Sequence, residues 1–138
     1  MAATLRLEIV TPEARAYSDD VELVVLPAVE GEMGVYPQHI PLITQLKPGE
    51  LVVTKDGKKI HLAVGEGFVE VTGTTVSVLV DMALTEGDID ENAAEEAVKR
   101  AEARLKEGNI GDEETALVQA AIAKSMAQLH VKRRRRGI

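Results

Sequence analysis

The chain has 138 residues, a formal net charge of −7 and no cysteine. This length suits one domain, or one small domain with an appendage, and the lack of cysteine excludes disulfides and thiolate metal sites. No apolar run reaches about 20 residues, the length that spans a bilayer, and the first residues lack the apolar core of a signal peptide, so we expect membrane association only through a partner.

The first predicted elements are strands. Leu5, Leu7 and Ile9 alternate with Thr4, Arg6 and Glu8, which is the period-two pattern of a half-buried strand. The run 21–26 is more continuously apolar and predicts one further, more buried strand.

A turn-rich segment follows, which we call the signature segment (residues 30–44): Glu30-Gly31-Glu32-Met33-Gly34-Val35-Tyr36-Pro37-Gln38-His39-Ile40-Pro41-Leu42-Ile43-Thr44. Its prolines fix φ and remove backbone donors, while its glycines permit conformations closed to other residues, so the pattern predicts a stiff loop. Apolar side chains in such a loop indicate one of two roles. The loop is either a rigid turn that closes one end of a β-sandwich, the fold that the strands below favour, or a surface that a partner covers.

Further short strands are predicted at 51–54, 60–64 and 76–80. Lys55-Asp56-Gly57-Lys58 is a hairpin signal, because Asp-Gly supplies the positive φ values of a type I′ turn, and Thr72-Gly73-Thr74 is a second expected turn. Many short strands separated by turns favour an antiparallel β-sandwich or barrel.

After residue 84 the apolar period becomes helical, which divides the chain into residues 1–84 and 85–138. Asp88 and Glu91 predict a capping box for a first helix, and Gly108-Asn109-Ile110-Gly111 ends it before Asp112 caps a second. The expected apolar stripes are Ala94, Ala97, Val98, Ala101 and Leu105 in the first helix, and Val118, Ala121, Ile122, Ser125, Met126 and Leu129 in the second. The predicted fold class is therefore α+β, an N-terminal antiparallel β-sandwich followed by a C-terminal antiparallel two-helix hairpin. Because alanine dominates the stripes, little apolar area is buried and we expect a weak seam between the helices.

No catalytic, cofactor or metal constellation stands out in the sequence. His39, His61 and His130 have no metal-ligand partner at useful spacing, and the GxxxxGK[ST] and GxGxxG phosphate patterns are absent. We expect no enzyme activity, no cofactor and no metal site. We predict that His61 lies on a solvent-exposed face. We interpret His61 and His130 as ordinary structural or surface histidines.

The signature segment closely resembles the Gly-x-Met/Leu-Gly-Val/Ile-x-Pro-x-His-x-Pro-Leu-x-Thr pattern of the epsilon subunit of the bacterial rotary F-type ATP synthase. The resemblance continues in Lys47-Pro48-Gly49, Gly67-Phe68-Val69-Glu70-Val71, Asp88-Ile89-Asp90 and Ala127-Gln128-Leu129. It implies a non-catalytic central-stalk subunit that couples proton translocation to ATP synthesis, with C-terminal helices that inhibit ATP hydrolysis. It also implies a peripheral location on the cytoplasmic side of the inner (plasma) membrane.

The resemblance assigns partners to particular residues. The gamma subunit and the membrane c-ring would face Glu32, Met33, Val35, Tyr36, His39 and Leu42 of the signature segment. The alpha/beta catalytic head would be contacted by basic residues of the raised helices, namely Arg100, Arg104, Lys124, Lys132, Arg133, Arg134, Arg135 and Arg136. The family often has Gly where this chain has Gln38, and Ala where it has Ile40. Because Gln does not readily adopt positive φ, we expect a different local turn at Gln38.

Some bacterial epsilon subunits bind ATP through an Ile/Leu-Asp-x-x-Arg-Ala motif. Here Ile89 and Asp90 match, but Ala93 replaces the arginine and Leu84 replaces an acidic residue upstream. Because alanine cannot replace a bidentate guanidinium, we expect the ATP-sensing motif to be degraded. Asp90 then serves as a first-turn carboxylate that interacts with the helix dipole.

The basic C-terminus leaves alternatives open. Residues 1–84 carry −6, residues 85–108 carry −4 and residues 109–138 carry +3. Such a tail is typical of an interaction arm, and it also suits a solvated terminus or a nucleic-acid contact. The alternative function is a free-standing β-sandwich adaptor with an Arg-rich nucleic-acid-binding tail. Since Tyr17, Tyr36 and Phe68 are the sole aromatic residues and the body is acidic, we expect no nucleic-acid partner.

Overall fold

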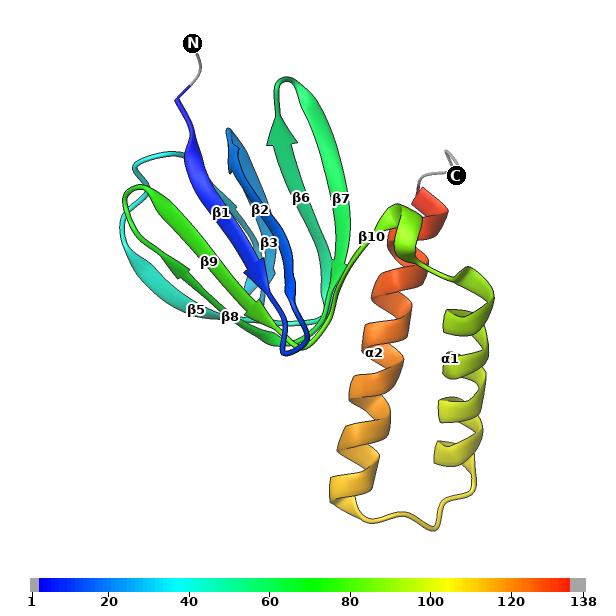
Figure 1. The fold of residues 1–138 in the computed structure, drawn as a ribbon. Helices are drawn as coiled ribbons and strands as arrows, with labels where there is room; N and C mark the ends of the chain where they lie inside the picture. Colours follow the sequence, from blue (N-terminus) through cyan, green and yellow to red (C-terminus); the bar gives the residue numbers. More distant parts are fainter. Residues whose placement is uncertain (1–2, 135–138) are drawn as a thin grey trace.

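A computed structural model of the chain describes residues 3–134, and Figure 1 shows a β-sandwich followed by a helical hairpin. The predicted fold class is confirmed. The strands are β1 (Leu5–Val10), β2 (Arg15–Val21), β3 (Leu23–Ala28), β4 (Gly31–Val35), β5 (Leu42–Leu46), β6 (Gly49–Lys55), β7 (Lys58–Val64), β8 (Gly67–Val71), β9 (Thr75–Val80) and β10 (Ala83–Thr85). A 3-10 turn, η1 (Glu86–Asp88), leads to the helices α1 (Glu91–Lys106) and α2 (Asp112–Arg134).

The strands follow the spatial order β10-β7-β6-β3-β5-β8-β9-β1-β2, and β4 pairs with β3 off this path. β3 and β5 are joined through the single pair Ala28 and Leu46, so the sheet folds there into two layers. Among the described strands every pairing is antiparallel except that of β1 with β9. The inward side chains of both layers form one aliphatic core that includes Leu7, Leu26 and Leu62, each fully buried.

The predicted strand at 21–26 is wrong as a single element. β2 ends at Val21 and β3 begins at Leu23, with Glu22 between them. Val24 and Leu26 are buried while Val25 is half-buried, so this apolar run alternates like a two-faced strand.

Both predicted turns are confirmed. Asp56 and Gly57 have φ values of 52° and 75°, as the β6–β7 hairpin requires. The backbone N–H of Thr72 donates to the carbonyl oxygen of Thr75 at 2.9 Å, which closes the β8–β9 turn.

The prediction that the whole signature segment is a loop is wrong. Gly31–Val35 is strand β4, and the segment ends within β5, which leaves residues 36–41 as the loop. β4 pairs with β3 in the register Leu26 to Met33, and Val35 is 1% exposed. Backbone pairing and the burial of inward side chains outweigh the turn-forming composition.

The helices form the predicted antiparallel hairpin, and α2 rather than α1 packs on β6 and β7 (Figure 1). The cap prediction at Asp88 is wrong. Asp90 is the N-cap of α1 and its side chain accepts from the backbone N–H of Ala93 at 3.0 Å, while Asp88 lies in η1. Asp112 likewise lies in the first turn of α2 rather than before it.

The predicted apolar stripe of α2 is wrong in part. Ser125 and Leu129 are buried as expected, but Met126 is 49% exposed, and Ala127 and Val131 are buried instead. The reason is that α2 has two neighbours, α1 on one side and the sheet on another. Ala127 and Val131 join Ala63 and Ile89 in a second small cluster. Among the described residues of α2, all the buried side chains lie between 125 and 131, and the connected ends of the hairpin project beyond the sandwich (Figure 1).

Candidate functional site

An uncovered apolar surface lies on the outside of the β5-β8-β9-β1 layer. Phe68 on β8 is in register with Leu79 on β9, and Leu79 is in register with Val10 on β1. Ile43 on β5 lies two residues further along the strands, because Gln45 is the partner of Phe68 and Ile43 is the partner of Glu70. The exposed fractions are 36% for Val10, 70% for Ile43, 56% for Phe68 and 54% for Leu79. We call these four residues the outer apolar face.

Most of the outer apolar face was missed by sequence reasoning. Its members occupy the solvent-facing positions of strands whose inward residues, such as Val69 and Val78, are fully buried. The available signal was an apolar residue at an alternate position, as in Leu79 between Val78 and Val80. Contiguous exposed apolar surface is the usual mark of a site that a partner covers.

The predicted partner-facing residues of the signature segment lie in different environments. Glu32 and Tyr36 are exposed, whereas Met33, His39 and Leu42 are half-buried. Val35 points into the core and is 1% exposed, so its side chain packs within the sandwich and does not face a partner. In the loop, Ile40 is 79% exposed, and Nδ1 of His39 lies 2.7 Å from the carbonyl oxygen of Ile40.

The expectation that Gln38 avoids positive φ is wrong. Gln38 has a φ of 66°, and its backbone N–H donates to the carbonyl oxygen of Gly73 at 2.9 Å. A left-handed conformation costs a non-glycine residue about 1–2 kcal/mol. The hydrogen bond ties the 36–41 loop to the β8–β9 turn and holds Gln38 in this conformation.

The basic residues predicted to contact catalytic subunits are engaged within the chain. On the hairpin itself, Arg100 lies 4.0 Å from Glu96, and Arg104 contacts Glu107 at 2.6 Å and Glu114 at 2.9 Å. Arg104 therefore links the two helices near their connection.

Other cations of this set link α2 to the rest of the chain. Lys124 lies 3.4 Å from Asp81, Lys132 lies 3.6 Å from Glu86, Arg133 lies 3.0 Å from Glu91 and 3.2 Å from Glu95, and Arg134 lies 3.3 Å from Glu50. Arg135 and Arg136 lie outside the described residues. In this conformation α2 is held by a small apolar contact surrounded by ion pairs.

The contact between α2 and the sandwich contains a cluster of titratable groups. The side chain of Glu50 on β6 is 8% exposed, and its Oε2 lies 2.9 Å from Nδ1 of His61 on β7. Its Oε1 lies 3.3 Å from Arg134 and 3.8 Å from Nε2 of His130, both on α2. We call Glu50, His61, His130 and Arg134 the junction cluster. The prediction of a solvent-facing His61 is corrected, because the side chain is 28% exposed and paired with a buried carboxylate.

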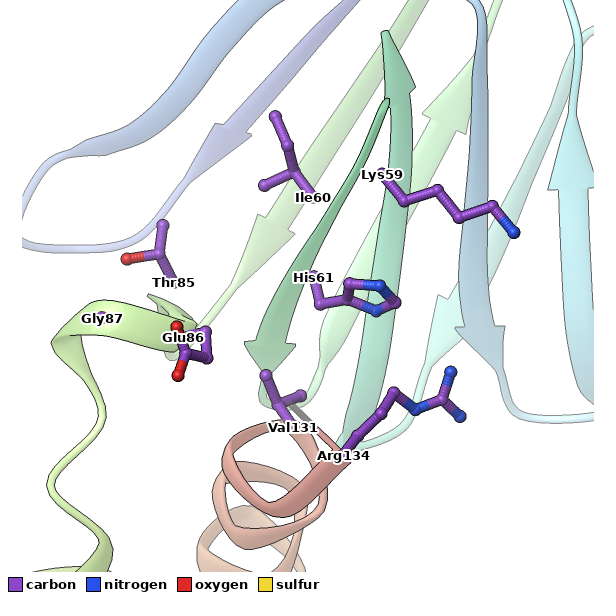
Figure 2. A pocket seen from close by; sticks show the side chains of 8 residues that line it. All are labelled: Lys59, Ile60, His61, Thr85, Glu86, Gly87, Val131 and Arg134. Atoms are coloured by element: carbon purple, nitrogen blue, oxygen red, sulfur yellow. The ribbon is translucent and has the colours of Figure 1, made fainter. Parts of the chain in front are cut away.

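A pocket of about 480 Å³ opens beside the junction cluster. Figure 2 shows His61 of β7 and Arg134 of α2 projecting to the same side, with Thr85 and Glu86 on the other. Val131 of α2 lines the pocket as well. The pocket thus lies where the sandwich, η1 and the end of α2 meet.

The residues of the degraded nucleotide motif have structural roles in this conformation. Ile89 is 4% exposed within the second apolar cluster, and a carboxylate oxygen of Asp90 accepts from the backbone of Ala93. Within residues 3–134, no group of His, Asp and Glu side chains is arranged to hold a metal ion. The same residues contain no helix that is both long and apolar enough to cross a bilayer.

Comparisons with known proteins match both parts of the chain. The model of the "ATP synthase, Delta/Epsilon chain, beta-sandwich domain" matches residues 4–86, and that of the corresponding "long alpha-helix domain" matches residues 88–133. The ATP synthase epsilon chain of Chromobacterium violaceum is 43% identical over 127 residues, which cover 91% of this chain and 90% of the relative. That of Desulfosudis oleivorans is 48% identical over 109 residues, covering 78% and 82%.

Solved structures share the fold. A chain in the Euglena gracilis mitochondrial ATP synthase, determined as an OSCP/F1/c-ring assembly, aligns with a TM-score of 0.77 at 24% identity and covers 94% of this chain and 81% of that one. A chain from the central stalk and c-ring of the Tetrahymena thermophila mitochondrial enzyme aligns with a TM-score of 0.57 at 14% identity, covering 96% of both.

Proposed function

The chain belongs to the ATP synthase delta/epsilon family, as an epsilon chain, and on this premise we propose that it is a rotor component that couples proton translocation to ATP synthesis. Its sandwich binds the gamma subunit and the membrane c-ring, and its helical hairpin inhibits ATP hydrolysis. It performs no catalysis itself. Its place is peripheral, on the cytoplasmic side of the bacterial inner membrane, because the complex holds it there.

The observation that carries the binding proposal is the outer apolar face. Three of its residues lie in one register row across three strands, which gives a flat and stiff contact surface. A rotor component must transmit torque without yielding, and a sheet with a filled core resists deformation. We assign the gamma subunit to this face.

The signature segment extends this surface toward the c-ring. Glu32, Tyr36 and His39 offer a carboxylate, an aromatic ring and an imidazole at or near its surface, whereas the half-buried Met33 and Leu42 pack against the main core. Pro37 and Pro41 stiffen the loop, so binding costs little additional ordering. A polar and apolar mixture of this kind suits the polar loops of a membrane ring.

The ion pairs of α2 support the proposed inhibitory switch. Raising the helices would separate Lys124 from Asp81 and Arg134 from Glu50, and acidic residues of the catalytic subunits would replace these partners. An exposed ion pair such as Lys124 with Asp81 is worth only about 0–1 kcal/mol. Glu50 is 8% exposed, but it keeps His61 as a partner when Arg134 leaves, so the exchange stays nearly balanced. The small apolar contact of Ala127 and Val131 adds a modest further cost of undocking. Two conformations of similar free energy are what a switch requires.

ATP hydrolysis by the reconstituted alpha/beta/gamma head tests this function. The full-length chain should inhibit strongly, and a truncation after Gly87 should bind without inhibiting, since the main core lies within the sandwich. Equal hydrolysis rates with both forms bound would refute the inhibitory role, and failure of both forms to bind would refute the coupling role.

A reversible cross-link sharpens the test. Because the chain has no cysteine, Ala63→Cys with Ala127→Cys would place thiols in one buried cluster that joins β7 to α2. Oxidation should hold the hairpin down and relieve inhibition, and reduction should restore it. Full inhibition by the oxidised form would contradict the moving-helix mechanism.

A further inference from the structure

The junction cluster places His61 and Arg134 at the two oxygens of one carboxylate, that of Glu50. Glu50 and His61 both belong to the sandwich, on neighbouring strands, so their contact at 2.9 Å does not depend on α2. Arg134 reaches the same carboxylate from α2, at 3.3 Å. The sandwich therefore presents one negative charge to Arg134 while His61 is neutral, and no net charge once His61 is protonated.

We propose that His61 makes the docking of α2 sensitive to acid, because the positive charge of a protonated His61 offsets the carboxylate charge of Glu50 that attracts Arg134. Histidine is the side chain whose ordinary titration falls between about pH 5 and 8. Docking brings the permanent charge of Arg134 to the Glu50–His61 pair, which disfavours a proton on His61. By linkage, the docked state gains stability as pH rises and loses it as pH falls.

His130 acts in the opposite direction and more weakly. It lies on α2, so its protonation adds an attraction to Glu50 that exists in the docked state alone. Its distance from Glu50 is 3.8 Å and its side chain is 57% exposed, whereas that of His61 is 28% exposed. Arg134 lies 3.5 Å from His130 on the same helix, so the interaction of these two side chains does not depend on docking. His130→Gln removes this opposing attraction and so isolates the effect of His61.

The other charged groups around the junction are Lys, Arg, Asp or Glu side chains, residue types whose ordinary pKa values lie outside the range from pH 6 to 8. Lys59 and Glu86 line the adjoining pocket, and Glu86 also pairs with Lys132. The remaining pairs that hold α2 are Lys124 with Asp81, and Arg133 with Glu91 and Glu95 of α1. The third histidine of the chain, His39, lies in the 36–41 loop.

This inference rests on the proposed function, because it assumes that the helices have a docked and an undocked state. If the undocked hairpin is the inhibitory form, acid favours inhibition of hydrolysis. Docking is a property of the isolated chain, however, and can be measured without the catalytic head. A failure of the inhibitory role in the hydrolysis assay is thus distinct from a failure of the acid response.

The test is single-molecule energy transfer on the full-length chain at pH 8, 7 and 6. Dyes on Lys58→Cys, at the β6–β7 hairpin, and Ala116→Cys, exposed on α2, report docking. We expect the ratio of docked to undocked molecules to fall roughly three- to tenfold from pH 8 to pH 6, the scale of one partly screened charge interaction. Repeating the series with Val131→Ala, which weakens the apolar contact, brings both states into the measurable range.

Matched variants identify the responsible group. His61→Gln should abolish the acid response, and His130→Gln should steepen it by removing the opposing attraction. Asp81→Asn should lower docking equally at every pH, because the ordinary pKa values of Lys and Asp lie outside this range. His39→Gln should change nothing. A pH-independent ratio in both backgrounds, tighter docking in acid, or an unchanged acid response in His61→Gln would each overturn the proposal.

Discussion

Truncating Phe68 separates binding from folding more clearly than any other change to the outer apolar face. A phenylalanine side chain offers about 150–250 Å² of surface. Phe68 is 56% exposed, which leaves about 100 Å² for a partner to cover, worth about 2.5 kcal/mol at about 25 cal/mol per Å². Phe68→Ala should therefore weaken binding to the gamma-containing head by about 10- to 70-fold, the upper figure applying if a partner buries the whole ring.

The assay is biolayer interferometry against the immobilised alpha/beta/gamma head, with urea unfolding of each variant in parallel. Phe68→Ala should change the free energy of unfolding by less than about 1 kcal/mol, because the side chain lies outside the core. Leu117→Ala is the matched control when both substitutions are made in the oxidised Ala63→Cys/Ala127→Cys chain, whose hairpin is held down, since Leu117 is 71% exposed on α2, away from the outer apolar face. Binding by Phe68→Ala within twofold of the parent, or an equal loss in Leu117→Ala, would refute the assignment of this face to the gamma subunit.

Three further predictions concern stability. Gly67→Ala would place a Cβ 1.8 Å from the carbonyl oxygen of Leu79. Because the backbone cannot move aside, we expect the free energy of unfolding, measured in urea, to fall by about 2–4 kcal/mol. An unchanged urea midpoint would show that β8 and β9 have room for the added methyl group. Gln38→Gly should stabilise the chain by about 0.5–1 kcal/mol because it relieves the left-handed strain, and any destabilisation in the same assay would contradict that reading. The hydrogen bond from Lys55 lowers the pKa of Asp19, so its stabilising contribution is present above about pH 4 and lost as pH falls through the lowered pKa. Asp19→Asn should then show a smaller decrease in melting temperature than the parent between about pH 4 and pH 2, and an equal decrease would exclude this pair from acid unfolding.

The apolar pattern of a strand or helix was predictable from the sequence where that element packs against a single neighbour. β1 and β9 each bury one face in a single core, so their period-two pattern was readable, and the Asp56-Gly57 hairpin followed from local φ requirements. The helical hairpin followed for the same reason, because short connections and periodic apolar residues are local signals.

Predictions failed where a segment has two neighbours or where tertiary pairing competes with local preference. α2 packs against α1 and the sheet at once, so a single stripe could not describe Ala127 and Val131. β4 forms despite its turn-rich composition because β3 offers it a pairing edge. Gln38 accepts positive φ because the carbonyl oxygen of Gly73, distant in sequence, holds its N–H.

By itself, the sequence determined the family and the two-part architecture, because these depend on residue types and short spacings. Only the tertiary structure decided that Phe68, Leu79 and Val10 form one row, and that Glu50 meets both His61 and Arg134. The physical reason is that strand order and helix docking bring together residues far apart in the chain. Those contacts depend on the summed burial and pairing of the whole molecule, which no local pattern records.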